Sequence, residues 1–381
     1  MSRSSKKKAA KKRKLVFFLV LIVVLAFGGL VAYAKFAKDK PLPVQIETEY
    51  TDKQVYPWQD ERRENDGRPI SEENAPKDTE SDVPVSEEKT GDVSNEAVLE
   101  ESDPVVSNDP GYLEVHFIDV GQGDSILLKY VDTIPDDGDD SAAMLVDAGD
   151  DSKGTLVRNY IKKQGVSELS YFVCTHPDAD HIGGAASIVS NVPITSETVW
   201  MPDVSKDTKT YDNLINEIKN KWYSYGMPVL SQEYKLGEAT FVFVAPEKEH
   251  SDVNSNSLVF KIWLGDDSFL FTGDCEEEEE LELVSSSYKD ILDSDVLKVG
   301  HHGSKTSSSE DFLSLVSPEI AVISCGEGNS YHHPHAAALN NLRNAGCDLY
   351  RTDIQGSIVA TTYGDGIKWN ASACNDWTAG E

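Results

Sequence analysis

The chain contains little cysteine, and none of it is spaced in pairs. Five cysteines are scattered without a CxxC pair: Cys174, Cys275, Cys325, Cys347 and Cys374. A cysteine zinc site or a disulfide framework needs paired or clustered thiols, so neither is predicted. Because three of the five follow apolar, strand-like runs, we expect buried free thiols.

Two patterns that mark other enzyme classes are also missing. The glycine-rich block Asp119–Asp124 is not followed by Gly-Lys-Ser or Gly-Lys-Thr, which argues against a phosphate-binding loop. The chain has no Gly-x-Ser-x-Gly elbow, which argues against a serine hydrolase.

Positive charge is scarce beyond the first 40 residues. Residues 1–40 carry 11 Lys/Arg against 1 acid, and residues 41–110 carry 6 against 20. Residues 111–381 carry 18 against 45, a net charge of −27. Proteins that bind nucleic acid generally present basic surfaces, so this charge disfavours DNA as a partner.

The basic head precedes a long apolar run. Residues 1–14 are polybasic, and residues 15–34 carry no charge. Twenty residues of helix span about 30 Å, the thickness of a bilayer core. We therefore predict a cytoplasmic segment at 1–14 and an uncleaved, single-pass membrane anchor at 15–34. A signal peptide cleaved after Ala34 is the competing interpretation. Either way, the rest of the chain is expected outside the cytoplasm, with the cell membrane as its partner and no protein partner predicted.

Two further segments follow the anchor. Residues 35–110 are rich in acids, Ser, Pro and Asn and poor in large apolar residues, which predicts a disordered linker. From residue 111 to residue 381, strand patterns recur from Leu113–Ile118 to Ser357–Thr361, and helical patterns such as Tyr211–Tyr225 lie between them. These patterns predict one large α/β or α+β domain, and we assign the fold class α/β.

Histidines and aspartates gather where the predicted strands end. The run from His176 to His181 follows a strand and places Asp178 and Asp180 between two imidazoles, which favours a metal site over a polar helix cap. The strand before Gly273-Asp274 and the strand before His301-His302 end in similar polar groups. The block His332–His335 is the fourth such group, and a histidine-rich surface turn is an equally good interpretation of it. The acidic run after Asp274 is expected to be a solvated helix face, and His250 a plain surface residue.

These blocks resemble, in order, the ComEC-type branch of the metallo-β-lactamase superfamily. The matching segments begin with Phe117–Ser125 and Leu145–Gly149 and continue with the His176 run and Asn254–Ser257. They end with Thr272–Asp274, Leu297–Lys305, Tyr331–His335 and Asp353–Ser357. The resemblance covers the chain from about residue 112 onward. It implies a four-layer αβ/βα sandwich with a site for two divalent metal ions, zinc or manganese.

The resemblance also implies a role for each site residue. His176 and Asp178 would hold one metal ion, and Asp180 and His181 the other. Asp274 would bridge the two ions, and Asp180 would also serve catalysis. His301, in preference to His302, would complete the ligands of the second metal ion. Asp147 would brace the ligand loop, and His333 and His335 would face the substrate as proton donors. Ser304 and Lys305, which lie beside His301 in the sequence, are expected to contact a phosphate.

The sequence departs from many superfamily members in two places. Position 178 is Asp where many members have His, and an asparagine/serine block replaces their third histidine block. A ligand set rich in oxygen shifts the preference from zinc toward manganese. The expected activity is that of a membrane-anchored metal-dependent hydrolase, most specifically a phosphodiesterase or nuclease-like enzyme. A hydrolase of a carbonyl substrate (lactone or thioester) and a non-catalytic surface binding module are the alternatives.

Overall fold

The computed structural model describes residues 111–133 and 141–380. The predicted segments 1–14, 15–34 and 35–110 lie outside the described residues, and their assignments stay predictions. Among the helices that are described, none combines the length and the apolar character needed to cross a bilayer.

The described residues form two mixed β-sheets. The first is an eight-stranded sheet, in spatial order β15 (Ile367–Trp369), β14 (Ile358–Thr362), β1 (Gly111–Phe117), β2 (Ile126–Asp132), β3 (Ala142–Val146), β4 (Tyr171–Val173), β5 (Thr198–Trp200) and β6 (Ser224–Gly226). The second is a seven-stranded sheet, in spatial order β13 (Asp348–Arg351), β12 (Ile320–Ile323), β11 (Val296–Lys298), β10 (Asp267–Phe271), β9 (Val259–Leu264), β8 (Ala239–Ala245) and β7 (Glu233–Leu236).

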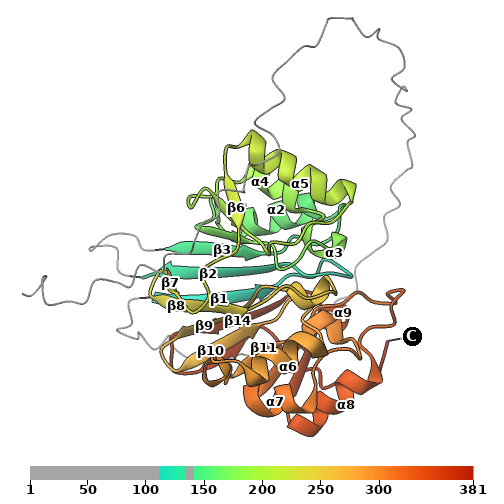
Figure 1. Cartoon of the computed structure of the whole chain (residues 1–381). Helices are drawn as coiled ribbons and strands as arrows, with labels where there is room; N and C mark the ends of the chain where they lie inside the picture. The colour runs from blue at the N-terminus through green and yellow to red at the C-terminus, as the bar shows by residue number, and fades with distance from the viewer. Residues whose placement is uncertain (1–110, 134–140, 381) are drawn as a thin grey trace, which may run out of the picture. The chain divides into compact units, whose positions relative to one another are not determined.

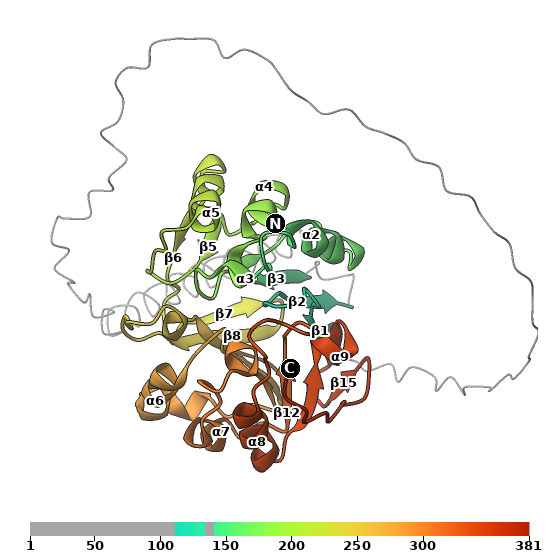
Figure 2. The same cartoon turned by 90° about the vertical axis from the view of Figure 1, so that its right-hand side faces the viewer.

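Helices cover the outer face of each sheet. On the first sheet lie α2 (Gly154–Lys163), α4 (Ala185–Asn191) and α5 (Lys209–Asn220), and on the second lie α6 (Glu277–Ser285), α7 (Glu310–Val316) and α8 (Ala336–Ala345) (Figures 1 and 2). Shorter turns are α3 (Ala179–Ile182), α9 (Thr352–Gln355), η1 (Asn254–Asn256), η2 (Lys289–Ile291) and η3 (Gly300–Gly303). The four layers agree with the predicted α/β sandwich.

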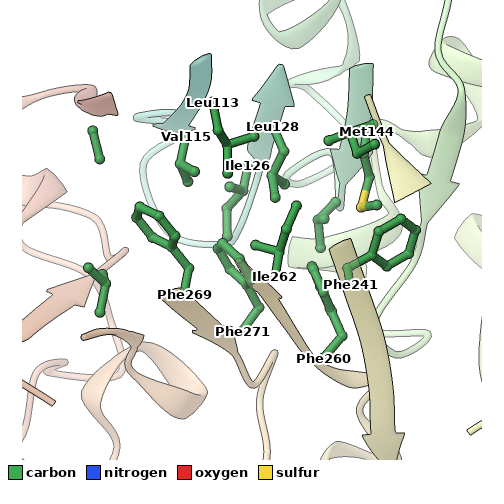
Figure 3. Packing of buried hydrophobic residues seen from close by; sticks show 14 of the residues in the cluster. Leu113, Val115, Ile126, Leu128, Met144, Phe241, Phe260, Ile262, Phe269 and Phe271 are labelled. Carbon is green, nitrogen blue, oxygen red and sulfur yellow. The ribbon is translucent and has the colours of Figure 1, made fainter. Parts of the chain in front are cut away.

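The core between the sheets is built from alternating strand residues. Leu113 and Val115 of β1 point inward, and Phe269 and Phe271 of β10 face them from the second sheet (Figure 3). This alternation is the expected pattern for a strand with one face against a core. Each fully buried side chain of this size contributes about 1.5–3 kcal/mol of transfer free energy, so this layer fixes how the sheets stack.

Capping residues set the ends of several helices. The side chain of Thr208 accepts a hydrogen bond from the backbone N–H of Tyr211 at the start of α5, and Ser309 does the same for Phe312 in α7. The predicted helix Tyr211–Tyr225 ends earlier than expected, because Ser224–Gly226 pairs with β5 as an edge strand. Tertiary pairing overrides the helical pattern there.

The cysteine prediction is confirmed. All five cysteines are free thiols; four are buried, and Cys374 is half-buried. Burial raises the pKa of the Cys174 and Cys275 thiols well above the ordinary value, which favours the protonated thiol at both positions.

The topology brings the polar groups to one edge. Strands β3 to β6 run parallel, as do β10 to β13. The carboxyl ends of parallel strands meet at a common edge, where α/β folds build their sites. Asp147 follows β3, His176 closely follows β4, Asp274 closely follows β10 and His301 closely follows β11.

Candidate metal centre

Asp147 braces the histidine run of the first sheet. Its Oδ1 accepts a 2.8 Å hydrogen bond from the backbone N–H of Thr175, and its Oδ2 accepts one of 2.6 Å from the Thr175 hydroxyl. Oδ2 also accepts a 2.8 Å hydrogen bond from Nδ1 of His181. The run from residue 176 to residue 181 is therefore held against the end of β3, with the imidazoles of His176 and His181 only 4.1 Å apart between ring centroids.

Asp274 lies opposite this run and is surrounded by imidazoles. Its Oδ1 is 3.1 Å from Nε2 of His181, and its Oδ2 is 3.4 Å from Nε2 of His302. The same Oδ2 is 3.8 Å from Nε2 of both His176 and His301. Four imidazole nitrogens from the two sheets thus converge on one carboxylate.

The preceding residue, Gly273, permits this close approach. It has a φ of +50°, and a Cβ atom there would lie 2.8 Å from the Thr175 side chain. A larger residue would therefore push the Asp274 turn away from the histidine run, because only glycine tolerates both the conformation and the crowding.

The double-histidine turn after β11 has an unusual backbone. His301 and His302 both adopt left-handed conformations, with φ of 46° and 54°. Two consecutive non-glycine residues in this region store strain, which is typical of functional sites. The turn aims both rings at Asp274, and each ring is fixed from behind. Nδ1 of His301 donates to Glu276 at 2.8 Å, and Nδ1 of His302 donates to the carbonyl of Ser324 at 2.9 Å.

These hydrogen bonds show that the site fits metal ions. Nδ1 of His181, His301 and His302 each faces an acceptor and carries the proton, so in the neutral rings Nε2 presents its lone pair toward Asp274. Nε2 of His181 and Nε2 of His302 are 3.3 Å apart, so with both Nδ1 atoms protonated the Nε2 lone pairs of two neutral rings face each other. Nε2 of His176 and Oδ1 of Asp274 are buried without a hydrogen-bond partner. Lone pairs and carboxylates that converge in this way require cations.

The electrostatics lead to the same conclusion. Burial alone lowers the pKa of His181 and of His302, but the Asp274 carboxylate and its neighbours raise both pKa values well above the ordinary range. Burial likewise opposes ionisation of Asp274, yet His181 and His302 hold its pKa well below the usual value. The pocket thus favours positive charge at the point where the four imidazoles meet, and bound divalent ions would supply that charge.

The structure brings together most of the predicted ligands. His176, Asp180, His181, Asp274 and His301 all belong to this cluster. Asp178 forms an ion pair instead, with its Oδ1 2.5 Å from Nζ of Lys206. His302, the less favoured of its pair in the sequence, lies deeper than His301, with Nε2 3.2 Å from Asp180 Oδ2. The individual ligand roles remain predictions.

The sequence interpretation missed Asp124. Its carboxylate groups with His181, Asp274 and His302, and one ligand atom from each lies within 4.8 Å of the others. Asp124 closes the glycine-rich block, which also belongs to the matching segment Phe117–Ser125, but the sequence assigns this residue no role. Its position at the end of a conspicuous block was the signal that could have identified it.

A loop that carries His333 and His335 forms one wall of the site. The ring of His333 is 5.3 Å from that of His301 and 4.8 Å from that of His335. Burial, together with the positive charge of His302 and His301, lowers the pKa of His333 to about 3. Nδ1 of His335 accepts a 3.0 Å hydrogen bond from the backbone N–H of Lys305, so its Nε2 carries the proton.

Ser304 and Lys305 differ in exposure. The Ser304 side chain is buried, and its hydroxyl is 2.9 Å from that of Thr306. Lys305 is exposed and makes no ion pair with the residues that the structure describes. Only the lysine is free to meet an anionic substrate directly.

Two sequence interpretations near the site are wrong. His250 is a buried residue, with Nε2 2.9 Å from Glu282 Oε2. In the acidic run, Glu276 supports His301, and Glu279 and Glu280 are 1% exposed. The sequence predicts a solvated helix face from Glu276 to Glu280 because the charges are contiguous. In the structure, however, the side chains of Glu279 and Glu280 on α6 are buried.

Comparisons with known proteins agree with this geometry. The model of the metallo-beta-lactamase superfamily matches residues 118–327. The chain is 32% identical to ComE operon protein 3 of Bacillus subtilis over 274 residues, which cover 64% of this chain and 32% of that protein. It is 32% identical to competence protein ComA of Neisseria gonorrhoeae over 252 residues, which cover 66% of this chain and 32% of that protein. The chain therefore spans about a third of the length of these curated relatives.

A solved structure gives a similar alignment. Tm1679, described as a metal-dependent hydrolase of the β-lactamase superfamily, aligns with 68% of this chain and 99% of its own length, at 14% identity and a TM-score of 0.40.

Proposed function

The chain belongs to the metallo-β-lactamase superfamily, with a domain of the ComEC type, and we propose that it is a metal-dependent phosphodiesterase. The convergence of four imidazole Nε2 atoms on Asp274 carries this proposal. A hydrolase of this superfamily needs a strongly held cationic centre, and this cluster is built to hold one.

The residues that would hold the metal ions come from both sheets. His176, Asp180 and His181 approach from the first sheet, and Asp274, His301 and His302 from the second. When bound, two divalent ions lower the pKa of a water molecule and stabilise the negative charge that develops on the attacked group. Manganese and zinc both suit the mixture of imidazole and carboxylate donors.

Neutral histidines at the wall are placed to contact the leaving group. The lowered pKa of His333 keeps its ring uncharged at neutral pH, and the N–H of Lys305 fixes the tautomer of His335. His335 then offers Nε2–H as a donor to a substrate oxygen. A neutral donor beside a positively charged centre does not repel bound metal ions, and it can donate a hydrogen bond to the negative charge that develops on a departing oxygen.

Two observations support a phosphodiester over a carbonyl substrate. Exposed Lys305 lies beside the histidine wall, where it can meet an anionic oxygen. One curated relative, from Neisseria gonorrhoeae, is named for competence, and another, from Haemophilus influenzae, is named for recombination, which is a process of DNA. The net charge of −27 over residues 111–381 opposes binding of long polyanions. We therefore propose a short phosphodiester, such as a nucleotide or a wall-polymer unit, as the substrate class.

Residues 15–34 support a proposal about location. Their uncharged run after a polybasic segment suits a single-pass anchor with the hydrolase domain outside the cytoplasm. Protease added to intact cells should then degrade the domain, whereas a cytoplasmic domain would survive until the cells are lysed.

Hydrolysis of bis-p-nitrophenyl phosphate tests the activity. The purified protein is assayed after metal removal and again with Mn²⁺ or Zn²⁺, beside Asp274→Asn and the exposed control Asp290→Asn. We expect turnover that requires metal, survives Asp290→Asn and falls at least about 100-fold in Asp274→Asn. Metal-loaded protein that cleaves a lactone or thioester but no phosphodiester would overturn the substrate class. Metal-loaded protein with no turnover of any of these would indicate a binding role.

The salt dependence of turnover tests the size of the substrate. Activity on a short phosphodiester should change little between low and high ionic strength. A steep loss of DNA cleavage with added salt would instead show that this acidic domain accepts a long polyanion.

A further inference from the structure

A buried ion pair connects the two sheets beneath the imidazole cluster. Nζ of Lys298 lies 2.8 Å from Oδ2 of Asp124, and the two side chains are 0% and 2% exposed. Lys298 ends β11 of the second sheet, and Asp124 lies in the loop between β1 and β2 of the first. Elsewhere between the sheets, the contacts are made by the apolar core that Figure 3 shows.

Asp124 is linked to the ligands of the first sheet. Its backbone N–H donates to the carbonyl of Asp180 at 3.2 Å, and its own carbonyl accepts from Gly149 at 2.9 Å. The backbone there is tightly packed, because a Cβ atom on Gly123 would lie 2.2 Å from the carbonyl oxygen of Asp180. A displacement of Asp124 would therefore move the segment that carries Asp180 and His181.

Lys298 is linked in the same way to the ligands of the second sheet. Its carbonyl accepts a 2.8 Å hydrogen bond from the hydroxyl of Thr272, two residues before Asp274. Its Nζ donates to the carbonyl of Val299 at 2.9 Å, directly before the double-histidine turn. The two ends of the ion pair are thus tied to the two halves of the metal site.

The ion pair also contacts the cluster itself. Oδ1 of Asp124 lies 3.5 Å from Nδ1 of His302 and has no hydrogen-bond partner. The Lys298 ammonium at 2.8 Å is the counter-ion of this carboxylate. A negative charge behind His302 makes this imidazole a stronger donor toward a metal ion.

Stability does not explain why such a pair is present. Removing two charges from water costs about as much free energy as their attraction returns, and apolar replacements of buried ion pairs are often neutral or stabilising. An apolar pair at positions 124 and 298 would continue the surrounding core. The side-chain contacts of Lys298 Nζ with the carbonyl of Val299 and of Asp124 Oδ1 with His302 are what an apolar pair could not provide.

We propose that Lys298 and Asp124 form an inter-sheet clasp that fixes the distance between the metal ligands of the first sheet and those of the second. Both are positioning residues, because neither is proposed to touch substrate. The clasp requires that the cluster binds metal ions and is independent of which bond the protein hydrolyses.

Metal binding by Lys298→Met tests the clasp. We expect calorimetric titration of the metal-free protein with Mn²⁺ to show affinity about 10- to 100-fold below that of the wild type. The electron paramagnetic resonance spectrum of the bound Mn²⁺ ions should also change, because the spacing of their ligands is no longer fixed. Lys261→Met is the matched control, since Lys261 is a half-buried strand lysine of the same sheet that contacts the carbonyl of Asp293. This control should bind Mn²⁺ like the wild type.

The alternative is that Asp124 is itself a metal ligand, and that its ion pair with Lys298 competes with metal binding. Lys298→Met would then release the carboxylate and leave Mn²⁺ affinity unchanged or higher, which overturns the clasp. If Lys298→Met does not fold, the apolar double variant Asp124→Leu/Lys298→Met takes its place. A folded double variant with wild-type affinity and spectrum overturns the clasp, and weaker binding at unchanged thermal stability supports it. These readouts need no substrate, so they stay informative if the phosphodiesterase proposal fails.

Discussion

Oδ2 of Asp147 lies 2.8 Å from Nδ1 of His181, and both side chains are fully buried. The carboxylate fixes the ring so that Nε2 faces Asp274, and the same carboxylate holds the backbone of Thr175. One residue at the end of β3 thus orients the histidine run without reaching the centre of the site.

Asp147→Asn should therefore weaken both metal binding and folding. An amide can accept with only one atom, so either Thr175 or His181 loses its partner. We expect metal affinity to fall about 10- to 100-fold, as for other partners of metal-bound histidines, and the free energy of unfolding to fall by about 1–3 kcal/mol. Titration with Zn²⁺ and urea unfolding check the two effects. Wild-type affinity in this variant would contradict the bracing role.

Lys206→Ala should release Asp178. The two side chains form a partly exposed ion pair, and the lysine competes with any metal ion for the same carboxylate. We expect a several-fold gain in metal affinity if Asp178 joins the ligand set, because a competing cation has been removed. The control is Lys209→Ala, an exposed lysine nearby. Equal affinities for both variants would show that Asp178 does not bind metal.

Glu279→Gln should stabilise the protein at neutral pH. Burial, aided by Glu282 and Glu280, raises the pKa of Glu279 well above its ordinary value, and both of its oxygens lack hydrogen-bond partners. A carboxyl group with a raised folded-state pKa favours the folded state below its unfolded pKa. That contribution is lost as the pH rises through the folded-state pKa.

The gain from Glu279→Gln should therefore be small near pH 4.5 and larger at pH 8. Each kcal/mol recovered corresponds to about 2–4 °C in Tm for a domain of this size. Thermal unfolding at both pH values measures it, with exposed Glu277→Gln as the control. A gain that is the same at both pH values would contradict the assignment.

Gly380→Val should disturb the histidine wall. Gly380 donates a 2.9 Å hydrogen bond to the carbonyl of Pro334, and a Cβ atom there would lie 2.5 Å from the carbonyl oxygen of His333. A larger side chain must push the His333 loop away from the site. We expect kcat to fall about 10-fold or more, while metal content and Tm stay near those of the wild type. Ala371→Val, an exposed change in the same tail, should have no effect. A loss of metal content together with kcat would show that the loop acts on the metal ligands and not on substrate.

Local sequence was sufficient for the fold class and for most of the cluster. The groups around His176, Asp274 and His301 could be predicted as site residues because each follows a strand within a few residues. Parallel strands then deliver these groups to the same sheet edge. The α/β prediction and the buried cysteines rest on similarly local patterns of apolar residues.

The sequence by itself determined which segments carry the chemistry, because strand-to-loop transitions are encoded by neighbouring residues. Only the tertiary structure decided which side chain meets which. The pairing of Lys298 with Asp124 spans the two sheets, and the contact of Asp178 with Lys206 depends on a distant loop. The burial of His250 and Glu279 depends on how α6 packs on its sheet. Such contacts join residues far apart in the chain, so their distances follow from the packing of layers and not from any local pattern.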